Sequence, residues 1–266
     1  MSLIGMFILS GDTLLLQDTR KDRSWLLVAQ PGQKFFTHHG TIEFDSLINK
    51  VKYGSFIKTN LNYSFLVLKP TVADFIRHFK KRTQVIYEDD CGIIVGLSGI
   101  GPGSRVIEAG TGAGGLTCFL AFHVRPNGIV YSYDCNEEHQ LVAKKNLALT
   151  PYSSFVSFRP YDITHPDCPL EENVEAVILD FSTPWRAVKN AHKALKPGGS
   201  LIIFVPSWGQ VERSVAACEN SHLLIRSVFE LIRRDFRVST SAHIVRPLPR
   251  MVGFSAVIIH AIKIIP

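Results

Sequence analysis

Glycines gather at one point of this 266-residue chain, in the segment Glu108–Leu116, which reads EAGTGAGGL. Glycine lets the backbone turn sharply and approach a ligand without a Cβ in the way. A helix that begins directly after such a turn adds free N–H groups that point at the same spot. The glycines alone leave the ligand open, because Gly110, Gly112 and Gly115 also satisfy the G-x-G-x-x-G pattern of dinucleotide-binding enzymes.

Carboxylates stand where a ligand at this turn would need hydrogen-bond acceptors. Glu108 could meet a cationic aminoalkyl group, and Asp134, which ends a second apolar segment, could hold ribose hydroxyls. Asp162, followed by Ile163, could accept from an adenine amine, with a turn-stabilising aspartate as the open alternative. Together with Leu195–Gly199, these features resemble class I S-adenosylmethionine-dependent methyltransferases more than nicotinamide enzymes.

Alternating strands and helices must position these groups. The predicted strands are Ser104–Ala109, Ile129–Tyr133, Phe155–Phe158, Ala176–Phe181 and Ser200–Val205. The predicted helices are Ala113–Val124, Glu137–Leu149, Arg186–Leu195 and Gln210–Leu223. A final pair of strands near Phe236–Ile244 and Phe254–Ile264, with no long helix between them, indicates an antiparallel edge. The fold class is therefore α/β, a doubly wound, Rossmann-like methyltransferase sheet with an antiparallel last strand.

The segment before this sheet has a different pattern. Short apolar runs separated by turn signals such as Pro31-Gly32 and His39-Gly40 predict a small all-β domain over residues 1–70. Ala73–Lys80 then predicts a short helix with a basic end. The expected division is a β-rich domain at 1–70 and a catalytic domain at 71–266.

Composition limits the remaining classes. With 46% hydrophobic and 20% charged residues, the chain is neither disordered nor a coiled coil. The five cysteines include no C-x-x-C pair, so we expect neither a disulfide framework nor a zinc site. The same cysteine usage favours a reducing intracellular compartment. No metal and no membrane association are expected. The net charge of +6 is compatible with a nucleic-acid partner.

Four segments carry a closer family resemblance. The segments Thr83–Asp90, Glu108–Gly114, Leu179–Trp185 and Val205–Val211 resemble, in this order, the tRNA (adenine-1) methyltransferases that modify an adenosine in the T-loop. The chain departs from the family pattern at Ser182, Trp208 and Phe254. The resemblance covers nearly the whole chain and implies methyl transfer from S-adenosylmethionine to ring nitrogen 1 of adenine.

The resemblance also implies roles for individual residues. Asp180 is the expected catalytic residue, with capping of the following helix as the alternative. Tyr87, Ser207 and Gln210 are expected on the substrate side, with packing of Tyr87 and helix capping by Ser207 as alternatives. The expected cofactor-binding residues are Gln84, Glu108, Gly110, Thr111, Gly112, Ala113, Gly114, Gly115, Leu116, Asp134, Asp162 and Ile163.

Partners follow from the same resemblance. The implied substrate is tRNA, and the implied assembly is a homotetramer or a heterotetramer with a related non-catalytic subunit. The implied location is cytoplasmic, or nuclear in a eukaryote. Two other functions stay open: a non-catalytic or partner-dependent tRNA-binding subunit of the same fold, and a methyltransferase for another substrate.

Overall fold

A computed structural model describes residues 6–21, 23–81, 85–251 and 253–265 of the chain. Within the first 70 residues, four strands form an antiparallel sheet in the order β2-β1-β6-β5. These strands are β1 (Thr13–Asp18), β2 (Arg23–Val28), β5 (Phe56–Lys58) and β6 (Ser64–Leu68). A separate hairpin is made of β3 (Lys34–Thr37) and β4 (Gly40–Glu43), and a 3-10 turn, η1, spans Phe44–Ser46. The apolar side chains of these elements form a core of their own around Leu14, Leu16 and Phe65.

Helix α1 (Val72–His78) joins this sheet to the larger one. Its start is well defined, because Thr71 and Asp74 bond each other's backbone N–H groups in a capping box. Its last residue, His78, contacts the hydroxyl of Ser24 on β2 at 3.0 Å. Its Phe75 and Ile76 belong to the core that covers one face of the larger sheet, so the helix packs between the two parts.

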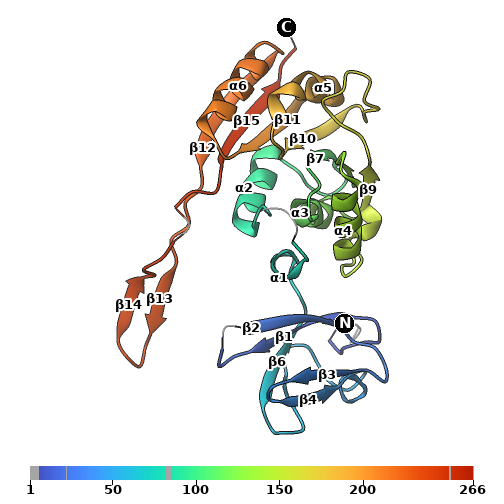
Figure 1. Ribbon diagram of the computed structural model, residues 1–266, viewed down its shortest axis with the longest axis vertical. Coiled ribbons are helices and arrows are strands. Elements are labelled where there is room, and N and C mark those ends of the chain that lie inside the picture. Colours follow the sequence, from blue (N-terminus) through green and yellow to red (C-terminus); the bar gives the residue numbers. More distant parts are fainter. Residues whose placement is uncertain (1–5, 22, 82–84, 252, 266) are drawn as a thin grey trace.

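The remaining residues form a seven-stranded sheet in the order β12-β15-β11-β10-β7-β8-β9 (Figure 1). The parallel strands are β7 (Arg105–Ala109), β8 (Ile129–Tyr133), β9 (Val156–Arg159), β10 (Val174–Leu179) and β11 (Leu195–Val205). Strands β12 (Leu223–Glu230) and β15 (Val257–Lys263) run antiparallel at one edge. This is the predicted doubly wound sheet with an antiparallel last strand.

Helices cover both faces of this sheet, as its nearly continuous apolar strands require. Helices α1, α2 (Glu88–Ser98) and α3 (Gly115–Val124) share one core with one face, and α4 (Glu137–Leu147) lies beside them. Helices α5 (Val188–Ala194) and α6 (Trp208–Glu219) pack on the other face. A short 3-10 turn, η3 (Pro184–Arg186), precedes α5 where the sequence predicted one longer helix.

Of the predicted final strand pair, the strand near Phe254–Ile264 and its antiparallel direction are confirmed by β15, but its pairing with the segment near Phe236–Ile244 is wrong. Strand β15 pairs with β12, whereas residues 236–247 form a separate hairpin of β13 (Phe236–Ser239) and β14 (Ile244–Pro247), which projects from the body of the fold (Figure 1). Most of the apolar run of β12 was not assigned to any strand, because it directly follows a helical pattern. Helix α2 was also missed, since Gly92 and Gly96 interrupt its apolar spacing.

No helix in the described ranges combines the length and the apolar character that crossing a membrane requires.

Candidate active site

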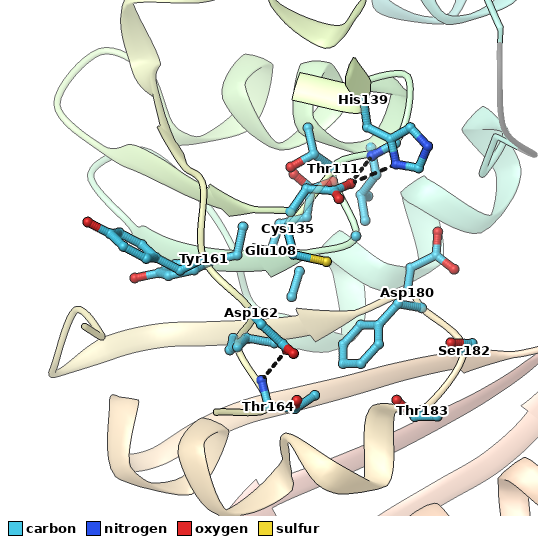
Figure 2. A pocket seen from close by; sticks show the side chains of 18 of the residues that line it. Glu108, Thr111, Cys135, His139, Tyr161, Asp162, Thr164, Asp180, Ser182 and Thr183 are labelled. Carbon is cyan, nitrogen blue, oxygen red and sulfur yellow. Dashed lines mark hydrogen bonds and ion pairs between the residues drawn. The ribbon is translucent and has the colours of Figure 1, made fainter. Parts of the chain in front are cut away.

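The site lies where the winding direction of the sheet reverses. Strands β7 and β10 are neighbours, and the chain leaves them toward opposite edges of the sheet, so a crevice opens at their carboxyl ends. A cavity of about 460 Å³ occupies this place (Figure 2). Of the predicted residues, the following line it: Glu108, Gly110, Thr111, Gly112, Ala113, Gly115, Leu116, Asp134, Asp162, Ile163 and Asp180. Gln84 lies outside the described residues.

The glycine turn brings two strand ends into contact. Gly110 has φ +100°, and a Cβ built there would lie 1.9 Å from the backbone oxygen of Asp180. Only glycine fits this approach, because a side chain would force β7 and β10 apart. Gly114 serves a different purpose, since it begins α3 with φ +82°, and a Cβ there would lie 2.9 Å from Leu147. Gly114 is not among the residues that line the cavity.

Glu108 is almost fully buried beneath the glycine turn. Its Oε2 accepts hydrogen bonds from Thr117 at 2.6 Å and Ser132 at 2.7 Å, while its Oε1 has no partner among the described residues. Burial raises the pKa of Glu108 to about 8, and the nearby Asp180 and Asp134 carboxyls act in the same direction. Because Glu108 lines the cavity, its Oε1 is available to hydrogen-bond a ligand bound there.

Asp134 ties the end of β8 to the glycine turn. Its Oδ2 accepts from the Gly112 backbone N–H at 3.1 Å and lies 3.2 Å from His139 Nδ1, while Oδ1 accepts from Asn136 N at 2.9 Å. These bonds fix the carboxylate at the cavity wall. His139 also lines the cavity, beside Asp134, although no sequence motif indicated it.

Asp162 stabilises its turn and also lines the cavity. Its Oδ1 accepts from Thr164 N at 2.8 Å, which is the bond of a turn-stabilising aspartate, and the residue also lines the cavity (Figure 2). Although burial acts to raise it, hydrogen bonds from Thr164 lower the pKa of Asp162. The carboxylate is therefore ionised and held in place. Tyr161 and Arg186 also line this end of the cavity and were missed, because neither belongs to a motif.

The lining is suited to S-adenosylmethionine. Four carboxyl groups line the cavity, those of Glu108, Asp134, Asp162 and Asp180, against the single guanidinium of Arg186 among the described lining residues. The ligand carries sulfonium and ammonium charges, ribose hydroxyls and an adenine amine, all of which complement carboxylates. The free Oε1 of Glu108 adds an acceptor, and a volume of about 460 Å³ lies within the usual range for small-molecule sites.

Asp180 lies on a wall shared by two cavities. It lines the first cavity and also a second one of about 780 Å³, together with Phe181 and Ser182. Burial raises the pKa of Asp180 to about 7. The helix-capping alternative does not apply, since Thr183 occupies the cap position of η3 and Ala187 that of α5.

The residues predicted on the substrate side lie around the second cavity. Tyr87 and Gln210 line it. Gln210 Nε2 donates to the backbone oxygen of Ser182 at 2.9 Å, and Ser207 Oγ donates to Gln210 Oε1 at 2.8 Å. Ser207 thus stands at the start of α6 without capping it through its side chain, and acts on the cavity wall through Gln210.

The mouth of the second cavity carries an ion-pair network that no motif indicated. Arg233, from the segment after β12, bonds Asp89 of α2 at 2.8 Å and Asp235 at 2.8 Å. Arg77 of α1 pairs with Glu88 of α2. The pair of Arg233 with Asp89 joins residues 144 positions apart in the sequence, so the sequence could not reveal it. Among the described residues, no group of three or more His, Cys, Asp or Glu side chains could hold a metal ion.

Comparison with known proteins identifies a family. The family model described as tRNA methyltransferase complex GCD14 subunit matches residues 63–248. The tRNA (adenine(58)-N(1))-methyltransferase TrmI of Thermus thermophilus is 32% identical over 247 residues, which cover 92% of this chain and 94% of the relative. The tRNA (adenine(57)-N(1)/adenine(58)-N(1))-methyltransferase TrmI of Methanocaldococcus jannaschii is 28% identical over 268 residues, covering 92% of each chain.

Solved structures show the same architecture. The crystal structure of TrmI from Aquifex aeolicus, a tRNA (m1A58) methyltransferase, matches with a TM-score of 0.80 and 26% identity, and covers 98% of this chain and 100% of its own. A Thermotoga maritima structure, described as a SAM-dependent O-methyltransferase, matches with a TM-score of 0.86 and 28% identity, and covers 97% of this chain and 94% of its own. Both matches span the amino-terminal sheet as well as the α/β sheet.

Proposed function

The chain belongs to the GCD14 family of tRNA methyltransferase complex subunits, and from this premise we propose that it methylates ring nitrogen 1 of an adenosine in the T-loop of tRNA, with S-adenosylmethionine as the methyl donor. The position of Asp180 carries the proposal. Its side chain belongs to the cavity that suits the methyl donor and also to the larger cavity beside it, so it faces the place where donor and acceptor must meet.

Binding of the donor rests on the first cavity. S-Adenosylmethionine, when bound, supplies a methyl group that is already activated. Glu108 Oε1 is the acceptor for its cationic aminoalkyl end, Asp134 for ribose hydroxyls and Asp162 for the adenine amine. The glycine turn allows the backbone to approach without side chains in the way. These residues orient the donor and exclude water from one side.

Binding of the acceptor rests on the second cavity. A target adenine must leave its stack and enter a pocket before its ring nitrogen becomes accessible. The second cavity, at about 780 Å³, has room for a nucleotide and borders the first at Asp180. Tyr87 lies at its wall, and Gln210 holds the Ser182 segment in place.

Asp180 performs the chemistry that falls to the protein. Its carboxylate accepts a hydrogen bond from the exocyclic amine, which orients the base and increases electron density on the ring nitrogen. After methyl transfer the adenine is cationic, and the proton that leaves its exocyclic nitrogen goes to Asp180. A pKa of about 7 suits a group that releases and takes up a proton near neutral pH.

The decisive test uses labelled S-adenosylmethionine, unmodified tRNA and identification of the product nucleoside. We expect 1-methyladenosine from the wild-type chain, and at least about a hundredfold loss of rate in Asp180→Ala with cofactor affinity retained. Asp167→Ala, at an exposed position that lines neither cavity, is the control. Cofactor binding without any 1-methyladenosine would refute the proposed reaction.

A second candidate reaction has one observation in its favour. The Thermotoga structure with a TM-score of 0.86 is described as an O-methyltransferase. The same product analysis separates the two reactions, because a methylated oxygen and 1-methyladenosine are different products. A non-catalytic subunit is the third candidate, and it would give no product until a partner chain is added.

Assembly is the remaining part of the proposal. The family is described as subunits of a complex, and we propose that this chain forms a tetramer, either of identical chains or with a related non-catalytic subunit. The projecting hairpin β13–β14 supports contact with another chain, since Phe236, Val238 and Val245 on one of its faces are 56%, 63% and 73% exposed. A tRNA substrate also implies an intracellular location, cytoplasmic or, in a eukaryote, nuclear.

A further inference from the structure

Trp208 is the most exposed large hydrophobic side chain of the described residues, at 74%. A tryptophan in that position loses much favourable burial unless another molecule covers it. Its location is informative, because it is the first residue of α6, directly after the carboxyl end of β11. Strand β11 is the parallel neighbour of β10, whose end carries Asp180, so Trp208 lies at the same edge of the sheet as the proposed reaction centre.

Trp208 does not stand alone. Its ring lies against that of Phe254, with centroids 6.3 Å apart and an angle of 36° between the planes. Phe254 lines the second cavity, and so does Gln210, two residues after Trp208. Phe254 reaches this place from the segment before β15. The two aromatic rings therefore form a surface that continues the wall of the second cavity outward, and we call Trp208 and Phe254 the aromatic rim.

We propose that the aromatic rim binds a nucleobase of the substrate RNA next to the flipped target, by stacking on Trp208. This inference rests on the proposed function and extends its substrate site. Flipping the target base out leaves the adjacent base without a stacking partner. The flat, exposed indole of Trp208 takes the place of that partner. Stacking tolerates any base, so the rim contributes affinity and register rather than sequence discrimination.

The other aromatic residues that line this cavity, Tyr87, Phe181 and Phe204, are less suited to stacking, because Phe181 and Phe204 are only partly exposed. Tyr87 lines the cavity, but the ammonium of Lys81 lies 4.9 Å from the centre of its ring and 3.3 Å from its hydroxyl. One face of that ring is thereby occupied within the chain. The charged groups near the mouth are engaged as well, since Arg233 bonds Asp89 and Asp235. The described contacts thus leave the indole of Trp208 as the exposed flat surface beside the cavity.

The test compares W208A and W208F with the wild-type chain. With tRNA as the varied substrate, W208A should raise KM about tenfold at nearly unchanged kcat, the loss expected for one stacked base, whereas W208F should retain most of the affinity. The KM for S-adenosylmethionine should stay unchanged. Phe36→Ala is the matched control, because Phe36 is 73% exposed but lies on β3 of the amino-terminal sheet.

Fluorescence gives a readout that does not depend on turnover. The chain has three tryptophans, and stacking of a base quenches the emission of an indole. A T-arm RNA should quench the wild-type emission, and the quench should be largely lost in W208F although that variant still binds the RNA. If the wild-type chain forms no 1-methyladenosine, the proposed function fails, whereas the quench still reports on stacking.

Three results would overturn the inference. One is unchanged KM and RNA affinity in W208A. Another is a loss confined to kcat, which would mark a structural role in the catalytic wall. The third is a lower native mass of W208A than of the wild type, which would assign Trp208 to contact between chains.

Discussion

Two carboxyl groups with raised pKa values end or nearly end neighbouring strands of the sheet. Glu108 and Asp180 are both shifted mainly by burial, but Glu108 also has hydroxyl donors from Thr117 and Ser132 on one oxygen. Asp180 has burial as the cause of its shift. A buried carboxyl costs stability when it is ionised, so these two groups agree with the proposed roles of Glu108 in cofactor binding and of Asp180 in proton transfer.

The rate should depend on pH through Asp180. Because its pKa is raised to about 7, the carboxyl is protonated at lower pH and cannot accept from the adenine amine. We expect kcat/KM to fall about tenfold per unit below a pH of about 7 and to level off above it. Initial rates between about pH 5.5 and 8.5 measure this. A profile that is flat between about pH 6 and 8 would contradict the role of Asp180.

Glu108→Gln should gain stability at high pH and lose function. The folded pKa of Glu108, about 8, lies above its ordinary value of 4.5, so its stabilising contribution is complete below about 4.5 and is lost as pH rises through about 8. Glutamine stays neutral at all these values. We expect the variant without ligand to melt roughly 2–4 °C above the wild type near pH 8.5, with the difference shrinking toward pH 5.

The same variant should bind the cofactor less tightly. A bound cation favours the ionised form of Glu108, which glutamine cannot adopt, so the affinity for S-adenosylmethionine should fall about tenfold or more. Calorimetric titration of the two proteins measures this, and Asp167→Ala serves again as the control. Equal affinity in Glu108→Gln and wild type would remove Glu108 from the cofactor site.

At the level of elements, the turn after β7 sets the distance between the carboxyl ends of β7 and β10. Gly110→Ala places a methyl group against the Asp180 backbone and forces a strained φ. We expect at least about 2 kcal/mol lower stability and loss of cofactor binding. Thermal melts with and without S-adenosylmethionine measure both effects.

A second glycine provides the matched comparison for that variant. Gly96 lies within α2, where a Cβ would meet nothing within 4 Å. Gly96→Ala should therefore be neutral or stabilise by up to about 1 kcal/mol, because alanine favours a helix. If Gly110→Ala behaved like Gly96→Ala, the close approach at Asp180 would not be required.

The division at residues 70 and 71 stays a prediction. Two observations support it: the residues before it form a separate apolar core, and the connecting helix α1 packs with the core of the larger sheet. Contacts such as the hydrogen bond from Thr13 Oγ1 to Leu149 O, at 2.7 Å, link the two parts. The sequence indicated the division through its change of pattern, from short strands to alternating strands and helices.

At the level of the whole molecule, the hairpin β13–β14 exposes apolar side chains that contacts within one chain do not cover. The hairpin projects from the body of the fold (Figure 1), and its Phe236, Val238 and Val245 are exposed. Val245→Asp would place a carboxylate in an apolar contact and should lower the native mass of the assembly. Native mass measurement checks this, with Phe36→Asp as the equally exposed control. An unchanged mass would exclude the hairpin from the interface.

Net charge also belongs to this scale. The value of +6 is small for a chain that must hold a folded RNA by itself, and several chains would combine their basic surfaces. Measuring native mass and the salt dependence of tRNA binding on the same samples tests whether assembly and RNA binding are linked.

The sequence by itself determined the fold class, the family and the glycine turn with its acidic partners, because these depend on local patterns: apolar periodicity, glycines after a strand, and carboxylates at strand ends. Tertiary structure alone decided which strand pairs with β15, that Asp180 borders two cavities, and that Trp208 and Phe254 meet. Each of these joins segments that are distant along the chain. Such contacts are set by sheet order and packing, which local spacing does not encode.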